Sequence, residues 1–469
     1  MERHETTTYD IAAEINRRPL GSQQILLFLV CGLIMLFDGF DIQVVSFTAP
    51  LLADHVGTKV AAFGPIFASG LLGLTLGSLA VGPVADRYGR KSLVLLSALI
   101  FGLFTVLTGY AESVRALILI RFLSGIGLGG GIPNAVALVA EYAPESVRTR
   151  IVGIAVSATP LGAALGGLAC WTLIGRLGWQ SVYWVGGAVP IILCIALGWW
   201  LPESIRFMVA AGRNPERIAA LLRRIAPDFR YQSGGQFVSG GTIHKGVAVR
   251  QLFTGGNAPR TLLLWLSYFM VFLMSFLLSS WLPSVLKLAG LGLSQAIVAL
   301  MLFNLGGVAG AVLLGRLIRR FSIYHVLGAA FVLSALSVNA LSHMEGIYNW
   351  ILLVIFVVGI CVQGSICILY ALTSSLYPTA IRVTGVGWAV GAGRFGAIFG
   401  PLIGGALLQA DWGMSGLFGF VSVPALVAAG AMLCLKGFAV SGPERELPVE
   451  AVMGDAYVTE ALGGTRLEC

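Results

Sequence analysis

Charged residues are scarce in this chain: they make up 11% of its 469 residues, whereas 57% are hydrophobic. A water-soluble domain carries about a quarter charged residues. With so few charges, folding in water would leave a large apolar surface exposed, so lipid is the expected solvent. The composition therefore predicts an integral membrane protein.

Several chemical patterns are also missing. The seven cysteines and five histidines form no CxxC or His-rich cluster, which argues against a disulfide framework and a metal site. There is no GxxxxGK[ST] loop for ATP and no hydrolytic triad, so we expect no cofactor and no enzyme activity. No small-residue cleavage site follows a short apolar core near the N-terminus, so the first apolar stretch is expected to stay as a helix.

Apolar runs recur along the chain. About 20 residues are needed to cross ~30 Å of hydrocarbon as a helix. Twelve runs meet that length, which predicts an all-α membrane protein with twelve transmembrane helices, at 22–48, 62–84, 92–110, 116–140, 150–174, 180–201, 260–286, 293–318, 322–342, 349–376, 384–409 and 413–437.

The basic residues predict the orientation. With both termini in the cytoplasm, the outer loops hold four of the 30 basic residues and two, Arg121 and Arg394, lie deep within spans, which leaves 24 on the cytoplasmic side or at the cytoplasmic ends of spans. This is the positive-inside pattern, and it explains the net charge of +8 without nucleic acid. We expect a multi-pass protein of the cell's inner membrane that acts as a monomer.

One long polar stretch separates six spans from six. The expected domains are a cytoplasmic N-terminal segment, a six-helix bundle, a cytoplasmic loop with a short helix near 215–225 and a Gly- and Ser-rich linker (QSGGQFVSGG), a second six-helix bundle, and a cytoplasmic tail, at 1–21, 22–201, 202–259, 260–437 and 438–469.

The two halves repeat one another. The loop after span two (Gly82-PVADRYGRK) has a partial copy after span eight (Gly315-RLIRRFS), and Pro144-ESVR, which ends at Arg148, corresponds to Pro378-TAIR, which ends at Arg382. Gly153, Gly162 and Gly166 match Gly387, Gly396 and Gly400. Such a repeat predicts two related bundles that rock against each other around a central site.

The loop after span two resembles the signature of the major facilitator superfamily. In this interpretation Gly82 allows close helix packing, Gly89 permits a tight turn, and Arg87 and Arg90 suit the cytoplasmic face, while Asp86 caps the next helix or pairs with an arginine. We interpret the loop as a conformational latch. A plain positive-inside loop with a turn would explain its charges but not the repeated spacing.

Two carboxylates lie deep in the first span, in Phe37-DGF-Asp41. Asp38 and Asp41 are three residues apart and therefore share a helix face. Intramembrane carboxylates are costly and usually functional, and burial favours their neutral, proton-carrying form. The alternative is a structural ion pair between helices.

Depth suggests a partner for these carboxylates. At 1.5 Å per residue, Asp38 and Asp41 lie roughly 24 and 28 Å from the inner start of span one, and Arg121 lies roughly 8 Å below the outer surface in span four. These levels overlap. We therefore predict an Asp–Arg contact, with Asp41 preferred over Asp38, and assign all three residues to proton coupling.

The D-G-x-D element, the loop after span two and the Pro202-ESIRF stretch together resemble the aromatic acid/proton symporter family. The resemblance covers nearly the whole chain. It implies a carrier of benzoate- or hydroxybenzoate-like acids in which Asp38 and Asp41 take part in proton coupling.

Arg394 lies near the middle of span eleven, flanked by glycines, and its repeat mate is Pro160. A lone cation in this place suits a substrate carboxylate. The alternative pairs it with an aspartate of span one, and the two states can alternate.

Glu141 ends span four near Arg148, and we interpret it as a cytoplasmic gate with Asp86 and Arg148; direct proton carriage is the alternative.

Other candidates for substrate contact lie at membrane depth. Gln363, Asn304 and Tyr370 carry groups that can bind a ring hydroxyl, although helix-to-helix hydrogen bonding is the commoner use. Trp388, Phe395 and Tyr268 are candidates to stack on an aromatic ring.

The sequence as a whole predicts a proton-coupled symporter that imports a small aromatic carboxylate by alternating access. Carriers of other organic or sugar acids remain alternatives. A drug/proton antiporter is disfavoured, because span five has Ala158-TPLG where exporters resemble one another in Gly-Pro-x-x-Gly-Gly. No motif in the sequence supports a membrane enzyme or a sensor.

Overall fold

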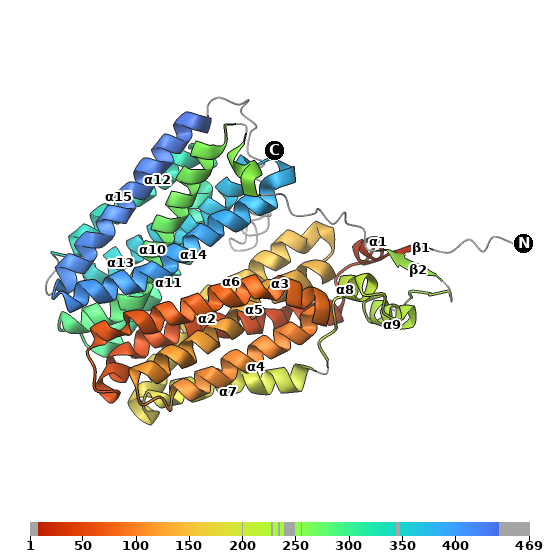
Figure 1. Cartoon of the computed structure of the whole chain (residues 1–469), viewed down its shortest axis with the longest axis horizontal. Helices are drawn as coiled ribbons and strands as arrows, with labels where there is room; N and C mark the ends of the chain where they lie inside the picture. Colours follow the sequence, from red (N-terminus) through yellow and green to blue (C-terminus); the bar gives the residue numbers. More distant parts are fainter. Residues whose placement is uncertain are drawn as a thin grey trace, which may run out of the picture.

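The computed structural model describes residues 8–198, 200–226, 228–232, 235–238, 249–254, 256–343 and 348–439. Long helices dominate this part of the chain and form two groups (Figure 1). The first group contains α2 (Ser22–His55), α3 (Gly64–Tyr88), α4 (Arg90–Thr108), α5 (Val114–Tyr142), α6 (Glu145–Leu177) and α7 (Gln180–Gly198). The second contains α10 (Ala258–Leu288), α11 (Leu293–Leu317), α12 (Ile323–Leu341), α13 (Tyr348–Leu376), α14 (Thr379–Gln409) and α15 (Gly413–Ala439).

These helices follow the predicted spans. Among the described residues, eleven are long and apolar enough to cross a membrane, and α7 has a shorter apolar stretch, Gln180–Ala196. Several helices run past the apolar runs: α2 continues through Pro50 to His55, seven residues beyond the predicted end. Helical hydrogen bonding does not stop where hydrophobicity stops, so an apolar run marks the membrane core and not the helix end.

Glycines let the helices of each half approach closely, and they do so at equivalent places. In the first half α2 packs along α6, and in the second half α10 packs along α14. A Cβ atom at Gly162 would collide with the carbonyl oxygen of Leu36, and one at the matched Gly396 would collide with that of Phe269. The predicted glycine correspondence therefore marks the same helix–helix contact in both halves.

The segments outside the long helices form a small layer at one end of the molecule (Figure 1). It contains β1 (Thr8–Asp10), α1 (Ile11–Asn16), α8 (Ile205–Ala210), α9 (Pro215–Ile225) and β2 (Gln236–Val238), while η1 (Val60–Phe63) and η2 (Val249–Phe253) precede α3 and α10. The short helix near 215–225 was predicted. The parallel pairing of β1 with β2 was not, and part of the predicted linker forms β2. The predicted C-terminal tail beyond residue 439 lies outside the described residues.

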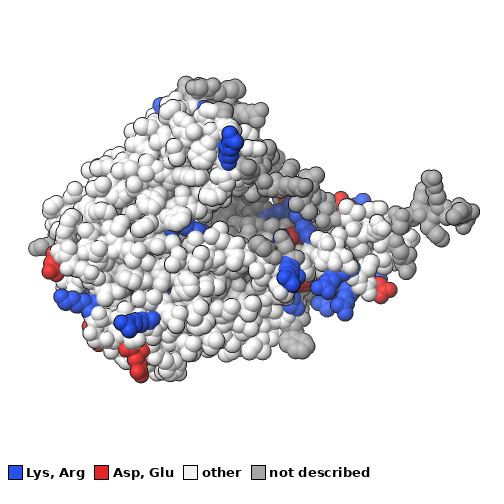
Figure 2. Space-filling model, viewed as in Figure 1, with Lys and Arg blue, Asp and Glu red and all other residues white. Residues whose placement is uncertain are grey.

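The two halves touch at the end opposite this layer and diverge towards it (Figure 1). Phe67 of α3 lies edge-on against Trp281 of α10, with ring centroids 5.4 Å apart. Gln409 of α14 donates a hydrogen bond to the carbonyl oxygen of Ala61, at 3.3 Å. Figure 2 shows a hollow between the halves on the side of the layer, and charged side chains gathered mainly at the two ends of the molecule.

Candidate functional site

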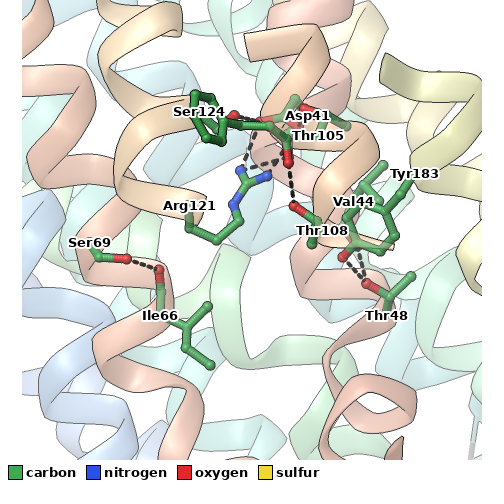
Figure 3. Close-up of polar contacts among 11 residues, drawn as sticks. Asp41, Val44, Thr48, Ile66, Ser69, Thr105, Thr108, Arg121, Ser124 and Tyr183 are labelled. Carbon is green, nitrogen blue, oxygen red and sulfur yellow. Dashed lines mark hydrogen bonds and ion pairs between the residues drawn. The ribbon is translucent and has the colours of Figure 1, made fainter. Parts of the chain in front are cut away.

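A buried ion pair joins α2 to α5. Arg121 donates from Nη2 to Asp41 Oδ2 at 2.7 Å and from Nη1 to Asp41 Oδ1 at 3.1 Å (Figure 3). Both side chains are almost completely enclosed. The arrangement is bidentate, which fixes the position of both planar groups as well as balancing their charges. This is the contact that depth along the two helices predicted.

Two hydroxyl groups complete the surroundings of Asp41. Thr105 of α4 donates to Asp41 Oδ1, and Ser124 of α5 donates to Asp41 Oδ2 at 3.3 Å. Donors from two neighbouring helices therefore hold this carboxylate in addition to Arg121. Buried charges require such compensation, because water is absent.

Asp38 has a different environment, although it lies one turn from Asp41 on the same helix. It is 2% exposed, and neither carboxyl oxygen has a hydrogen-bond partner among the described residues. The shared helix face was predicted correctly, but it does not give the two carboxyl groups equal surroundings. Asp41 is fully compensated and Asp38 is not.

Arg394 of α14 reaches across to the first half. Its Nη1 donates to Ser78 Oγ at 2.6 Å and to the carbonyl oxygen of Leu74 at 3.4 Å, both on α3. No carboxylate lies within ion-pair distance of Arg394 in the described part of the chain. The alternative that paired Arg394 with an aspartate of span one is therefore wrong for this conformation, since Arg121 already occupies Asp41.

The aromatic candidates differ in accessibility. Trp388 is 48% exposed and stacks one face on Trp265, with centroids 5.8 Å apart, while Phe395 is 59% exposed. Tyr370 is partly exposed and stands edge-on to Tyr268. Tyr268 is completely buried, and its hydroxyl bonds to Thr373 Oγ1 at 3.0 Å. In this conformation Tyr268 therefore supports Tyr370 and does not present its own ring.

The two amide candidates are engaged with protein groups. Ser275 of α10 donates to Gln363 Oε1 at 2.8 Å, which links α10 to α13. Asn304 donates from Nδ2 to the carbonyl oxygen of Leu300 in its own helix, at 3.1 Å. Gln363 thus makes the helix-to-helix bond that we considered the commoner use, and Asn304 is satisfied within α11.

The loop after α3 forms a tight turn at the end nearest α8. Gly89 has φ +91°, a conformation that other residues rarely adopt, so its predicted role in the turn is confirmed. Glu203 lies against Gly89 and accepts a hydrogen bond from the backbone nitrogen of Lys91 at 3.0 Å. Arg87 lies 5.5 Å from the centre of the Tyr88 ring. A Cβ atom at Gly82 would meet nothing within 4 Å, so the expected close packing at Gly82 is wrong for this conformation.

The predicted gate has different partners from those expected. Glu141 forms an ion pair with Arg90 and accepts a hydrogen bond from Ser204 Oγ. Arg148 donates from Nε to the carbonyl oxygen of Ala143 at 3.3 Å. Among the described residues Glu141 therefore pairs with Arg90 and not with Arg148, because the turn at Gly89 places Arg90 beside Glu141; the gate with Asp86 and Arg148 stays a prediction. The side chain of Asp86 lies outside the described residues.

Arg382 shows the same local bond as its repeat mate. It donates from Nε to the carbonyl oxygen of Tyr377 at 3.4 Å, five residues earlier, as Arg148 does to Ala143. The matched arginines therefore fix equivalent bends between helices.

In the described residues no group of three or more His, Cys, Asp or Glu side chains is placed to hold a metal ion.

Comparison with known proteins decides the family. A family model described as Major Facilitator Superfamily matches residues 31–325 and, again, 264–463. The chain belongs to the major facilitator superfamily. The two overlapping matches together span nearly all of the membrane-spanning helices.

Individual relatives sharpen this assignment. A gallate transporter of Pseudomonas putida is 38% identical over 425 residues, covering 90% of this chain and 94% of the relative. A 4-hydroxybenzoate transporter of Acinetobacter baylyi is 38% identical over 434 residues, covering 91% and 94%. The inward-open xylose transporter of E. coli matches with a TM-score of 0.70 at 19% identity, over 92% of this chain and 99% of that one.

These findings confirm the predicted fold class and the resemblance to the aromatic acid transporter family. This member of the superfamily is a multi-pass membrane protein of two related six-helix bundles. The roles given above to single residues, and the predicted domain boundaries, stay predictions.

Sequence reasoning missed three hydroxyl residues of the site: Thr105, Ser124 and Ser78. Each lies in an apolar span, and Ser124 is three residues from Arg121, which places it on the same helix face. That spacing was a usable signal. The sequence contains no such signal for the contact between Ser78 and Arg394, because that contact depends on how the two halves meet.

Proposed function

We propose that this chain is a proton-coupled symporter that carries a small aromatic carboxylate across the inner membrane into the cell. Its named relatives transport gallate and 4-hydroxybenzoate, and their similarity extends over about nine-tenths of the chain. We further propose that both termini are cytoplasmic and that the protein acts as a monomer. In this orientation the halves meet at the outer end, so the conformation described is inward-facing.

One observation carries the substrate assignment. Arg394 is a cation at membrane depth whose hydrogen-bond acceptors among the described residues are neutral, the hydroxyl of Ser78 and the carbonyl of Leu74. A guanidinium with neutral partners gains more from a carboxylate, which offers two charged oxygens in matching geometry. The substrate carboxylate would therefore displace Ser78 and Leu74 from Arg394.

The side chains around Arg394 suit an aromatic ring. Phe395 follows Arg394 directly and Trp388 lies two turns earlier on α14, and both are about half exposed. Tyr370 lies close enough to Arg394 to interact with it electrostatically. Aromatic rings pack favourably in offset and edge-on arrangements, so these three residues are the proposed ring contacts.

The proton pathway is proposed to use Asp38 and Asp41. Asp41 is held by Arg121, Thr105 and Ser124, an arrangement suited to an ionised carboxylate. Asp38 lacks such donors, so its neutral form fits its surroundings better. Transfer of a proton to Asp41 would weaken its hold on Arg121 and allow α2 and α5 to shift relative to each other.

Uptake of radiolabelled 4-hydroxybenzoate, gallate and benzoate by cells expressing the protein tests the proposal. We expect accumulation of at least one of these acids, faster at acidic than at neutral outside pH, and collapse of that accumulation when a protonophore removes the proton gradient. No uptake of any aromatic acid would refute the substrate class. Accumulation that survives the protonophore would refute proton coupling, and resistance to a cationic drug without acid uptake would favour the antiporter alternative.

A further inference from the structure

A pocket lies at the end of the first half that carries α8 and α9, away from Arg394 and Asp41. Residues from four segments line it: Gln23 at the start of α2, Tyr142 at the end of α5, Trp200 after α7, and Leu221 and Arg224 on α9. The start of α2 and the end of the α7 segment mark where the predicted spans meet the cytoplasm. The pocket therefore lies at the level of the lipid headgroups in the proposed orientation.

Hydrogen bonds keep the walls of this pocket in place. Gln24 donates from Nε2 to the carbonyl oxygen of Tyr142 at 2.7 Å, and the Tyr142 hydroxyl donates to the carbonyl oxygen of Glu203 at 2.6 Å. Gly21 lies against the carbonyl oxygen of Ile225, so the end of α9 packs on the start of α2. The pocket is thus a fixed part of the fold.

Arg224 is the charged residue among the side chains that line the pocket. Arg224 is exposed and has no ion pair among the described residues. The two carboxylates near this place are engaged elsewhere: Glu203 accepts hydrogen bonds from the backbone nitrogens of Lys91 and Ser204, and Glu141 forms an ion pair with Arg90. An exposed cation that lines a pocket and has no ion pair among the described residues favours an anion there.

Helix α9 itself is built to lie at a surface. Its apolar side chains Ile218 and Leu222 are buried against the protein, while Arg217 and Arg223 are exposed. Basic residues placed directly beside the inner end of a transmembrane helix are attracted to the anionic lipids of the cytoplasmic leaflet. The polar face of α9 therefore faces the membrane surface, but Arg217 and Arg223 are not among the residues that line the pocket.

An apolar surface continues from the pocket along α2. Ile25 and Leu29, one and two turns into this helix, are 47% and 64% exposed, and Leu26 beside them is also exposed. A soluble anion would make no use of this surface, whereas the acyl chain of a lipid would cover it. Trp200 at the rim is a residue type that favours the membrane interface.

We propose that this pocket binds the phosphate of an anionic phospholipid of the cytoplasmic leaflet, with Arg224 as its charged contact and Ile25 and Leu29 as the acyl-chain surface. The assignment rests on the orientation proposed above, but not on the transported substrate. Free inorganic phosphate shares the headgroup chemistry and differs in lacking the acyl chains.

Native mass spectrometry of the purified full-length protein tests this assignment. The protein is mixed with phosphatidylglycerol, with phosphatidylcholine, or with phosphatidylglycerol plus excess inorganic phosphate. We expect tighter retention of phosphatidylglycerol than of phosphatidylcholine, and no competition by phosphate. In Arg224→Gln, phosphatidylglycerol affinity should fall roughly tenfold, as expected for loss of one charge-assisted contact.

Matched variants separate the pocket from overall charge. Arg223→Gln removes the same charge from the neighbouring position on α9 and should retain lipid affinity near that of the unchanged protein. Arg224→Lys keeps the charge and should preserve most of the binding, which also guards against a folding defect in Arg224→Gln. Equal loss in Arg223→Gln and Arg224→Gln, or displacement of the lipid by inorganic phosphate, would overturn the proposal. Transport of aromatic acids does not enter this measurement, so its failure leaves the proposed function untouched.

Discussion

Arg394 of α14 donates a 2.6 Å hydrogen bond to the hydroxyl of Ser78 on α3, joining two residues that lie 316 positions apart and in different halves of the protein. The bond connects the proposed substrate-binding cation to the helix that packs along α5, which carries Arg121. A ligand that takes Arg394 away from Ser78 would therefore release a contact between the halves. In the proposed function, this release would couple substrate binding to the rocking of the two halves.

Replacement of Arg394 by alanine should weaken binding of an aromatic carboxylate. Loss of a hydrogen-bonded charge pair of about 2 kcal/mol corresponds to roughly thirtyfold lower affinity. Arg394→Lys keeps the charge but loses the bidentate geometry of the guanidinium, so its affinity should lie between those of the unchanged protein and Arg394→Ala. Equilibrium binding of labelled 4-hydroxybenzoate to the purified protein measures the effect. Ser78→Ala is the matched control and should leave affinity the same or higher, because the ligand then has less to displace; an equal loss in both variants would make Arg394 structural.

Replacement of Asp41 by asparagine should both destabilise the protein and abolish accumulation. The change leaves Arg121 buried without a counter-charge, and breaking a buried pair in this way costs about 3–5 kcal/mol. Thermal unfolding in detergent and proton-driven uptake measure the two effects. Thr105→Val removes one hydroxyl donor to the same carboxylate and should cost only about 1–3 kcal/mol. Full active uptake by Asp41→Asn would contradict its proposed role.

Replacement of Asp38 by asparagine should separate stability from coupling. Asp38 has no hydrogen-bonded partner to lose among the described residues, so thermal unfolding should stay within about 1 kcal/mol of the unchanged protein. If Asp38 carries a proton, the variant should exchange substrate across the membrane but lose the dependence of uptake on outside pH. Uptake with an unaltered pH profile would remove Asp38 from the proton pathway. The contrast with Asp41→Asn identifies which carboxyl group has which role.

Whether a feature could be predicted from the sequence depends on whether a local pattern or a contact between distant segments determines it. The twelve spans follow from the length of apolar runs, because the bilayer imposes that length directly. The contact between Asp41 and Arg121 was also predictable, since a fixed helical rise converts residue number into depth. In each case a local pattern determines the geometry.

Contacts set by how separate segments meet were not predictable in this way. Arg394 binds Ser78 only because α14 meets α3 in this conformation. Glu141 pairs with Arg90 because the turn at Gly89 brings the start of α4 beside the end of α5. The strands β1 and β2 are three residues each and 228 residues apart, too short to show any alternation of apolar and polar side chains. Their pairing needs the surrounding layer, which no local pattern specifies.

Closure of the outer end depends on two glycines that face each other. A Cβ atom at Gly405 of α14 would lie 3.0 Å from the carbonyl oxygen of Ala61, 3.2 Å from the Cα atom of Gly64 and 3.2 Å from the Trp281 ring. Gly405→Ala should therefore disfavour the closed outer end by about 1–3 kcal/mol, the usual cost of overpacking, and shift the protein towards an outward-facing conformation. Gly419→Ala, where a Cβ atom meets nothing within 4 Å, is the matched control.

Pulsed electron paramagnetic resonance measures this shift. Spin labels at exposed outer positions 112 and 294, one in each half, should report a longer distance in Gly405→Ala than in the unchanged protein, and no change in Gly419→Ala. Aromatic acid uptake should slow in Gly405→Ala, because the return to the inward-facing state becomes less favourable, while ligand affinity from the outer side is retained. An unchanged distance distribution together with unchanged uptake would show that α3 and α14 can separate slightly without opening the path, and would place closure of the outer end on the Phe67–Trp281 contact instead.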